Sequence, residues 1–277
     1  MSDDTTFLKI ASQWLIAIML TLALIIFFML MTAVQLTSET AGQRILRRGV
    51  AVTADIDATL PRIEFALRDA AQASQGADVR VPNFPVPIDV PEEQAARIEG
   101  AELRALILNQ SARRLYDDGT SAWASNDEAS EQNIEDVSTA GALHRGFGLI
   151  RDTWHNIFLV LAVLMGIISL ILAVMLMVSL RSYMRLVALG AAAAGAGVIS
   201  LAAAVGIRFA MRTAETEADP FEQGLIDLGV DTIWVFIRNY LILSVLGFAV
   251  LAIACLALWL QSRASTRSTV SHFDSAQ

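Results

Sequence analysis

Four long runs of apolar residues constrain this chain more than any other feature of its sequence. They cover residues 14–34, 157–180, 186–207 and 240–260, and none contains an acidic residue, a basic residue or a histidine. Each run exceeds the roughly 20 apolar residues with which a helix crosses a hydrocarbon core of about 30 Å. We therefore predict an all-α integral membrane protein with four transmembrane helices.

The first run resembles a secretory signal in position but not in length. Its apolar stretch is longer than the roughly 7 to 15 residues of a cleaved signal, and no small-x-small cleavage site follows it. We expect an uncleaved signal anchor, preceded by a short cytoplasmic tail at residues 1–13.

The charges that flank the runs predict how the chain is oriented. Basic residues close to a span favour the cytoplasm, and short segments carry this signal best. The turn 181–185 contains Arg181 and Arg185, and the final tail has Arg263 and Arg267 close to the last span. The segment 208–239 instead has an excess of acids. We therefore place both termini and the turn in the cytoplasm of a cell-membrane protein, and 35–156 and 208–239 outside.

Tryptophans mark the expected ends of the spans. Indole rings favour the boundary between lipid and water. We predict that four of the five tryptophans are interfacial anchors: Trp14, Trp154, Trp234 and Trp259.

Residues 35–156 are predicted to form a mainly helical extracytoplasmic domain between the first two spans. An apolar stripe at helical spacing runs from Ile56 to Ala70, with Pro61 expected to kink it or to separate two helices near Thr59. A cluster of prolines between residues 82 and 91 favours an extended, stiff crossover. A second helical region then follows, with a break at Gly100 and an end at Gly119.

Small residues distinguish the third span from the others. Glycine and alanine at helical spacing let neighbouring backbones approach closely, so we expect this helix in the middle of the bundle. The candidate packing residues are Gly190, Ala194, Gly195, Gly197 and Gly206. After it, 208–239 is expected to be a loop with an amphipathic segment at the interface, and 261–277 a disordered tail.

No motif of catalytic, metal-binding, nucleotide-binding or redox residues stands out in the sequence, and we predict no catalytic residue, cofactor or metal ligand. His144 and His155 could share a helix face, but two imidazoles without a third ligand make a weak metal site. Asp55 and Asp57 fit a solvated face better than an acid–base pair. Arg238 is expected to pair with Asp231 or Asp227. The absence of charge inside the runs argues against a pump.

The net charge of −8 argues against nucleic acid as a partner. The order of spans and loops resembles the outline of claudin-like four-helix proteins, but the outer segment lacks their cysteine pair and tryptophan motif, so no family follows from it. We expect a non-enzymatic accessory or scaffold subunit, with the lipid bilayer and other membrane subunits, or copies of itself, as partners. A sensor that signals through a separate partner is the first alternative, and a facilitative channel or carrier the second.

Overall fold

The computed structural model describes residues 2–74, 78–82, 84–119, 148–180, 183–214 and 220–274. The chain divides into two compact units. The membrane unit comprises Met1–Thr32, Leu159–Ala210 and Ile233–Gln277, and the helical unit comprises Ala33–Phe158 and Met211–Thr232.

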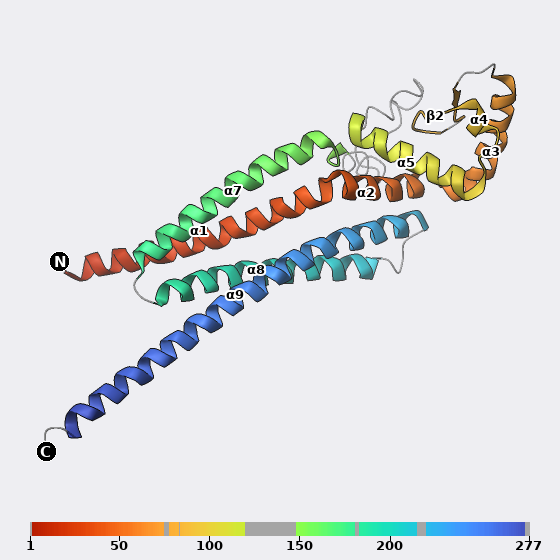
Figure 1. The fold of residues 1–277 in the computed structure, drawn as a ribbon. Helices are drawn as coiled ribbons and strands as arrows, with labels where there is room; N and C mark the ends of the chain where they lie inside the picture. Colours follow the sequence, from red (N-terminus) through yellow and green to blue (C-terminus); the bar gives the residue numbers. More distant parts are fainter. Residues whose placement is uncertain are drawn as a thin grey trace. The chain divides into compact units, whose positions relative to one another are not determined.

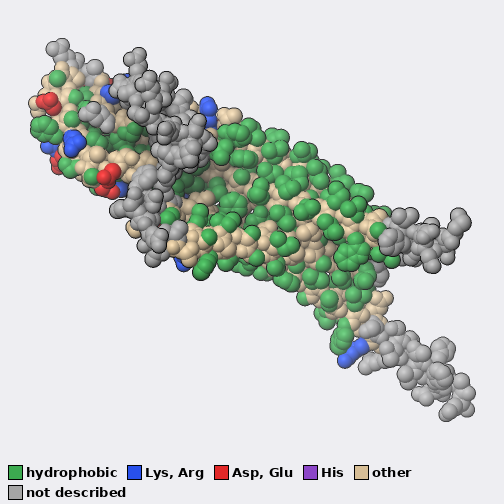
Figure 2. Space-filling model, turned by 180° about the vertical axis from the view of Figure 1, so that it is seen from behind, with side chains coloured by type: hydrophobic (Ala, Val, Ile, Leu, Met, Phe, Trp, Pro, Cys, Tyr) green, Lys and Arg blue, Asp and Glu red, His purple; other side chains and the backbone are tan. Residues whose placement is uncertain are grey.

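Four long helices dominate the chain (Figure 1): α1 (Ser2–Thr37), α7 (Asp152–Ser179), α8 (Met184–Ala214) and α9 (Pro220–Asp274). Each contains a stretch long and apolar enough to cross a membrane, from Ile10–Thr37 in α1 to Ile226–Gln261 in α9. Hydrophobic side chains cover the visible surface of these helices (Figure 2). This confirms the prediction of an all-α protein with four candidate spans.

The helices are longer than the apolar runs that predicted them. The segment 208–239 is not mainly a loop, because α8 continues to Ala214 and α9 begins at Pro220. Proline suits the first position of a helix, where no backbone amide is needed for an intrahelical bond. At its other end α9 continues to Asp274, through the segment in which we expected disorder. No glycine or proline follows Gly247 to interrupt it.

Glycines bring α8 and α9 into close backbone contact. A Cβ added at Gly190 would lie 2.8 Å from the amide nitrogen of Leu251, and one at Gly197 would overlap the Ser244 side chain and backbone. On α9, a Cβ at Gly247 would lie 2.7 Å from the Cα of Ala194. These positions thus require glycine if the two helices are to keep this separation.

The remaining glycines of the small-residue stripe lie elsewhere on α8. A Cβ added at Gly195 or Gly206 would meet no atom within 4 Å. Of the candidate packing residues, Gly190, Ala194 and Gly197 are therefore brought together against α9, and Gly195 and Gly206 are not.

Apolar clusters and a few hydrogen bonds connect α1 to the other spans. One cluster joins Leu20 of α1, Leu176 of α7 and Ala192 of α8. Two hydrogen bonds link α9 to α1: Asn239 Nδ2 donates to Thr32 Oγ1 at 2.9 Å, and the Tyr240 hydroxyl donates to the Ile25 carbonyl at 3.3 Å. Amide and hydroxyl groups buried between spans stabilise helix association because lipid offers them no alternative partner.

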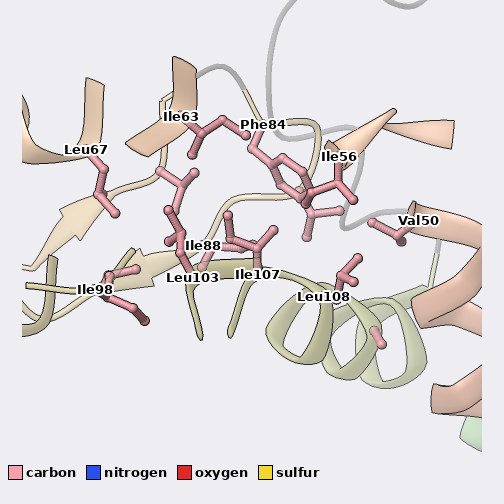
Figure 3. Close-up of a cluster of buried hydrophobic side chains, with 14 of the residues drawn as sticks. Val50, Ile56, Ile63, Leu67, Phe84, Ile88, Ile98, Leu103, Ile107 and Leu108 are labelled. Atoms are coloured by element: carbon pink, nitrogen blue, oxygen red, sulfur yellow. The ribbon is translucent and has the colours of Figure 1, made fainter. Parts of the chain in front are cut away.

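The helical unit contains α2 (Glu39–Thr53), α3 (Ile56–Ala73), α4 (Glu92–Ala95), α5 (Gly100–Asp118) and two short strands, β1 (Val79–Arg80) and β2 (Asp89–Val90). Side chains from α2, α3, α5 and the strand segment pack into one continuous core (Figure 3). Its fully buried members include Leu46, Ile56, Leu67, Ile88, Leu103 and Ile107. With no cysteine in this unit, apolar packing holds it together.

The proline-rich segment forms a hairpin. Val79 pairs with Val90 and Arg80 with Asp89 in antiparallel register, so the segment turns back on itself instead of crossing over. All four prolines between residues 82 and 91 lie outside the paired residues, which keep their backbone amides for the ladder. The alternating residues Val79, Val81, Val86, Ile88 and Val90 are all buried.

Two breaks divide the helical path that follows α1. The first is at Ser38, and the second lies at Ala54 and Asp55, between α2 and α3. The expected junction of two helices near Thr59 was therefore misplaced, since it lies at Ala54 and Asp55 and Pro61 lies inside α3. The kink expected at Pro61 as the alternative stays a prediction. Gly100 begins α5 with φ +55° and Gly119 ends it with φ +70°, which confirms both as breakpoints.

Gly247→Ala should weaken the association of α8 and α9. The new methyl group would overlap the Ala194 backbone, which cannot move aside as a side chain can, and overpacking of this kind costs about 1–3 kcal/mol. The measurement is the free energy of unfolding of the full-length protein in mixed detergent micelles.

Gly195→Ala is the matched control, because its methyl group has free space and alanine favours a helix by roughly 0.5–1 kcal/mol over glycine. Equal unfolding free energies for the two variants would contradict the α8–α9 contact.

Candidate functional site

A charged cleft of about 970 Å³ lies within the helical unit. It is formed where the end of α2, the start of α3, one residue of α5 and the first turns of α9 meet. Its lining residues are Arg48, Ala51, Val52, Thr53, Asp55, Asp57, Arg104, Gly224, Asp227, Leu228 and Asp231.

The junction of α2 and α3 creates one wall of the cleft. Asp55 adopts the left-handed conformation, with φ +39° and ψ 54°, a region that aspartate tolerates better than most residues. The Asp55 carbonyl then accepts hydrogen bonds from the backbone amides of Ala58 and Thr59, both at 3.1 Å, and these bonds start α3. This change of direction places Asp55 and Asp57 beside the last turn of α2.

An ion pair joins α3 to α5 across the cleft. Arg104 donates from Nε to Asp57 Oδ1 at 2.7 Å and from Nη2 to Oδ2 at 3.2 Å. Such a two-pronged contact is the strongest geometry for an arginine and a carboxylate. The hydrogen bond lowers the pKa of Asp57 below its ordinary value and raises that of Arg104. Asp57 is thus held ionised as a structural partner of Arg104.

A second ion pair joins α2 to α9. Arg48 donates to the carboxylate of Asp231. Nearby, Gly224 of α9 lies so close to α2 that a Cβ added to it would be 2.9 Å from Cγ2 of Val52. Leu228, one turn further along α9, packs against the core of the helical unit. The expected pairing of Arg238 with Asp231 or Asp227 is therefore wrong. Asp231 pairs with Arg48, far away in sequence, and no ion pair between Arg238 and Asp227 is found among the described residues.

The lining carries four aspartates and two arginines. Both arginines are engaged in ion pairs, which leaves Asp55 and Asp227 to give the cleft its excess of negative charge. The Thr53 hydroxyl donates to the Gly49 carbonyl at 2.9 Å. Among the described residues there is no group of three histidine, cysteine or acidic side chains that could hold a metal ion. Because six charged side chains line the cleft, it suits a polar ligand better than an apolar one.

A second feature of this unit is an exposed face of α3, the Phe65 face, formed by Ala58, Pro61, Arg62 and Phe65. These residues recur at intervals of three and four, opposite the buried Ile56, Ile63 and Leu67. Phe65 is 78% exposed. Burying an aromatic ring of this kind is a common anchor of protein–protein contacts.

Polar groups also meet where α2, α5 and α7 approach the end of α1. The Tyr116 hydroxyl donates to the Thr37 carbonyl at 3.0 Å, and Thr37 Oγ1 lies 3.3 Å from His155 Nδ1. Burial raises the pKa of Tyr116, and nearby carboxylates, first that of Asp152, raise it further. His155 thus has a local partner. His144, its expected companion, lies outside the described residues.

The expected anchors and topology residues lie in the following places. Trp14, Trp154, Trp234 and Trp259 are all exposed. The Arg208 guanidinium lies 5.0 Å from the centre of the Trp234 ring, and that of Arg263 lies 3.9 Å from the centre of the Trp259 ring. Arg185 Nε donates to the Leu180 carbonyl at 2.7 Å. Arg181 and the Arg267 side chain lie outside the described part of the chain.

No protein-family model matches this sequence, and neither a curated protein nor a solved structure is detectably similar to it.

Several residues of these sites were not singled out from the sequence. Arg48 and Arg104 gave no local signal, because their partners lie on other elements. Phe65 did carry one: it is a large apolar residue outside the stripe that runs from Ile56 to Ala70.

Asp57→Asn should lower stability at neutral pH by up to about 1 kcal/mol, the range for solvent-exposed ion pairs. Because the folded state lowers the pKa of Asp57, this contribution is present above the ordinary aspartate pKa of about 3.9 and is lost as pH falls through the folded value. The free energy of unfolding, measured from pH 7 down to pH 3, should show the two proteins converging.

Glu93→Gln serves as the control, since Glu93 is exposed on α4 and lies outside the cleft. A difference between wild type and Asp57→Asn that stays constant down to pH 3 would show that the carboxylate charge is not responsible.

Proposed function

We propose that this protein is a non-enzymatic accessory subunit of a membrane assembly, whose helical unit lies on the extracytoplasmic side and binds a protein partner through the Phe65 face. Both termini and the turn 181–185 are then cytoplasmic. The observation that carries the proposal is the exposure of Phe65 on a helix whose opposite side is fully packed.

The division of the chain supports this arrangement of loops. The helical unit combines Ala33–Phe158 with Met211–Thr232, and two candidate spans, in α7 and α8, separate these segments. Two crossings return the chain to the side from which it started, so a packed unit built from both segments is compatible with four spans. The basic turn 181–185 favours the cytoplasm, and the acidic segment 208–239, which belongs partly to the helical unit, favours the extracytoplasmic side.

The Phe65 face has the spacing of helical contact surfaces. Its residues occupy positions i, i+3, i+4 and i+7 of α3, the pattern with which a helix inserts anchors into a groove. Aromatic and arginine side chains dominate the energetics of protein contacts, and this face presents Phe65 next to Arg62. The core beneath it is complete without a partner, which supports a docking role over a structural one for these side chains.

A photocrosslinking amino acid at position 65 tests the proposal. In native membranes, it should produce a discrete adduct with one protein, and the same probe at Glu93 should not. Phe65→Ala should then reduce recovery of that protein with the purified complex by tenfold or more, as expected for an aromatic anchor that contributes about 2 kcal/mol or more.

The cleft favours a second function, that of a sensor. Asp227 and Asp231 line it from α9, and that helix continues without interruption through a candidate span to Asp274. A polar ligand that changed how Asp231 meets Arg48 would act directly on a spanning helix.

The two functions give different results. No adduct at position 65, together with a small polar molecule that raises the unfolding temperature of the full-length protein and fails to do so in Asp227→Ala, would overturn the accessory role in favour of the sensor.

A further inference from the structure

A groove of about 440 Å³ lies in the membrane unit between α1, α7 and α8. Its lining is apolar apart from Gln13 and Thr21, and Ala17, Ala188, Ala191 and Ala192 supply much of it. The small side chains leave space that longer residues would have filled. Trp14, Ile18 and Met184 line the groove and are more than half exposed, so it is open to the surroundings of the helices.

The two polar lining residues already have hydrogen-bond partners. Gln13 Nε2 donates to the Ser179 carbonyl at 2.8 Å, and Thr21 Oγ1 donates to the Ala17 carbonyl at 2.9 Å. A ligand inside the groove therefore needs no polar group to satisfy the side chains of Gln13 and Thr21. Since all three helices are candidate spans, the medium that reaches an open apolar groove on them is the acyl-chain region of the bilayer.

A positive charge lies at one end of the groove. Arg185 follows directly after the lining residue Met184, and its Nε is fixed on the carbonyl of Leu180, which also lines the groove. That bond uses one donor of the guanidinium and leaves the terminal nitrogens of an exposed side chain available. An apolar groove with an arginine at its end matches a molecule that has a long chain and an anionic head.

We propose that this groove is a binding site for an anionic phospholipid, with one acyl chain along α1, α7 and α8 and the phosphate at Arg185. Arginine suits this role because its planar guanidinium can donate two parallel hydrogen bonds to phosphate oxygens. Trp14 lines the groove at the end where Gln13 bonds to Ser179, and there it packs beside the part of the acyl chain nearest the phosphate. The site is independent of the partner bound by the helical unit.

Native mass spectrometry of the full-length protein in mild detergent tests this site. With phosphatidylglycerol and phosphatidylcholine of identical chains in equal amounts, phosphatidylglycerol should be retained in preference, by roughly tenfold, as a charged hydrogen bond implies. Arg185→Gln should abolish the preference while leaving weak retention of both lipids. Ala191→Leu should reduce retention of both, because its side chain occupies the groove.

Two matched variants control for general effects. Arg263→Gln removes a different cation close to a span end, and Ala203→Leu adds the same bulk to an exposed position of α8 outside the groove. Both should bind lipid like the wild type. If Arg263→Gln lost the preference as fully as Arg185→Gln, or Ala203→Leu lost retention as fully as Ala191→Leu, the lipid would be bound without a defined site, and the proposal would fail.

A fluorescence measurement needs no variant that fills the groove. Phosphatidylglycerol with brominated chains should quench part of the tryptophan emission in a saturable way, and Trp14→Phe should remove that part while Trp259→Phe should not. Glycerol phosphate, which has the head but no chain, should not reverse the quenching at the same concentration. Reversal by glycerol phosphate, or quenching that persists in Trp14→Phe, would overturn the proposed position of the chain.

Discussion

The hydrocarbon core of a bilayer offers no water to an unpaired backbone amide or carbonyl, and the form of the four long helices follows from that constraint. Four runs without charge have to be helical there, since a helix satisfies its own backbone. Apolar surface alone cannot hold such helices together, because lipid is as apolar as their side chains. Close contact at Gly190, Gly197 and Gly247, with the hydrogen bonds of Asn239 and Tyr240, supplies the specificity instead.

The helical unit follows a different principle. It buries leucine, isoleucine and valine away from water, and its two ion pairs at the cleft lie on the surface, where they orient elements more than they stabilise them. Helix α9 belongs to both units: Gly224 and Leu228 contact the helical unit, and Tyr240 and Gly247 contact other spans. The first turns of α9 therefore pack as in a water-soluble domain, and its later turns pack as a candidate span does in lipid.

The spans could be predicted from the sequence because transfer of an apolar run into lipid depends on composition and length, not on neighbours. Breaks at Gly100 and Gly119 were also predictable, since a positive φ favours glycine locally. The hairpin was missed although Val86, Ile88 and Val90 alternate with other residues, because four nearby prolines suggested an unpaired chain. The pairing of Arg48 with Asp231, 183 residues apart, has no local signature at all.

The small-residue stripe shows the same limit within a single helix. Composition marks Gly190, Gly195, Gly197 and Gly206 as equivalent, yet only some of them meet α9, because which face is covered depends on where the other helices lie. Gly247 was overlooked for the converse reason: it is a lone glycine among large residues, and its importance comes from Ala194 on the helix opposite.

Accessibility of single cysteines tests the central claim, that residues 33–158 and 211–232 form one unit on one side of a membrane crossed four times. In a Cys255→Ser background, a membrane-impermeant maleimide should label Glu93→Cys and Asp227→Cys in intact cells, and Tyr183→Cys only after permeabilisation. Labelling of positions 93 and 227 from opposite sides of the membrane would contradict the account.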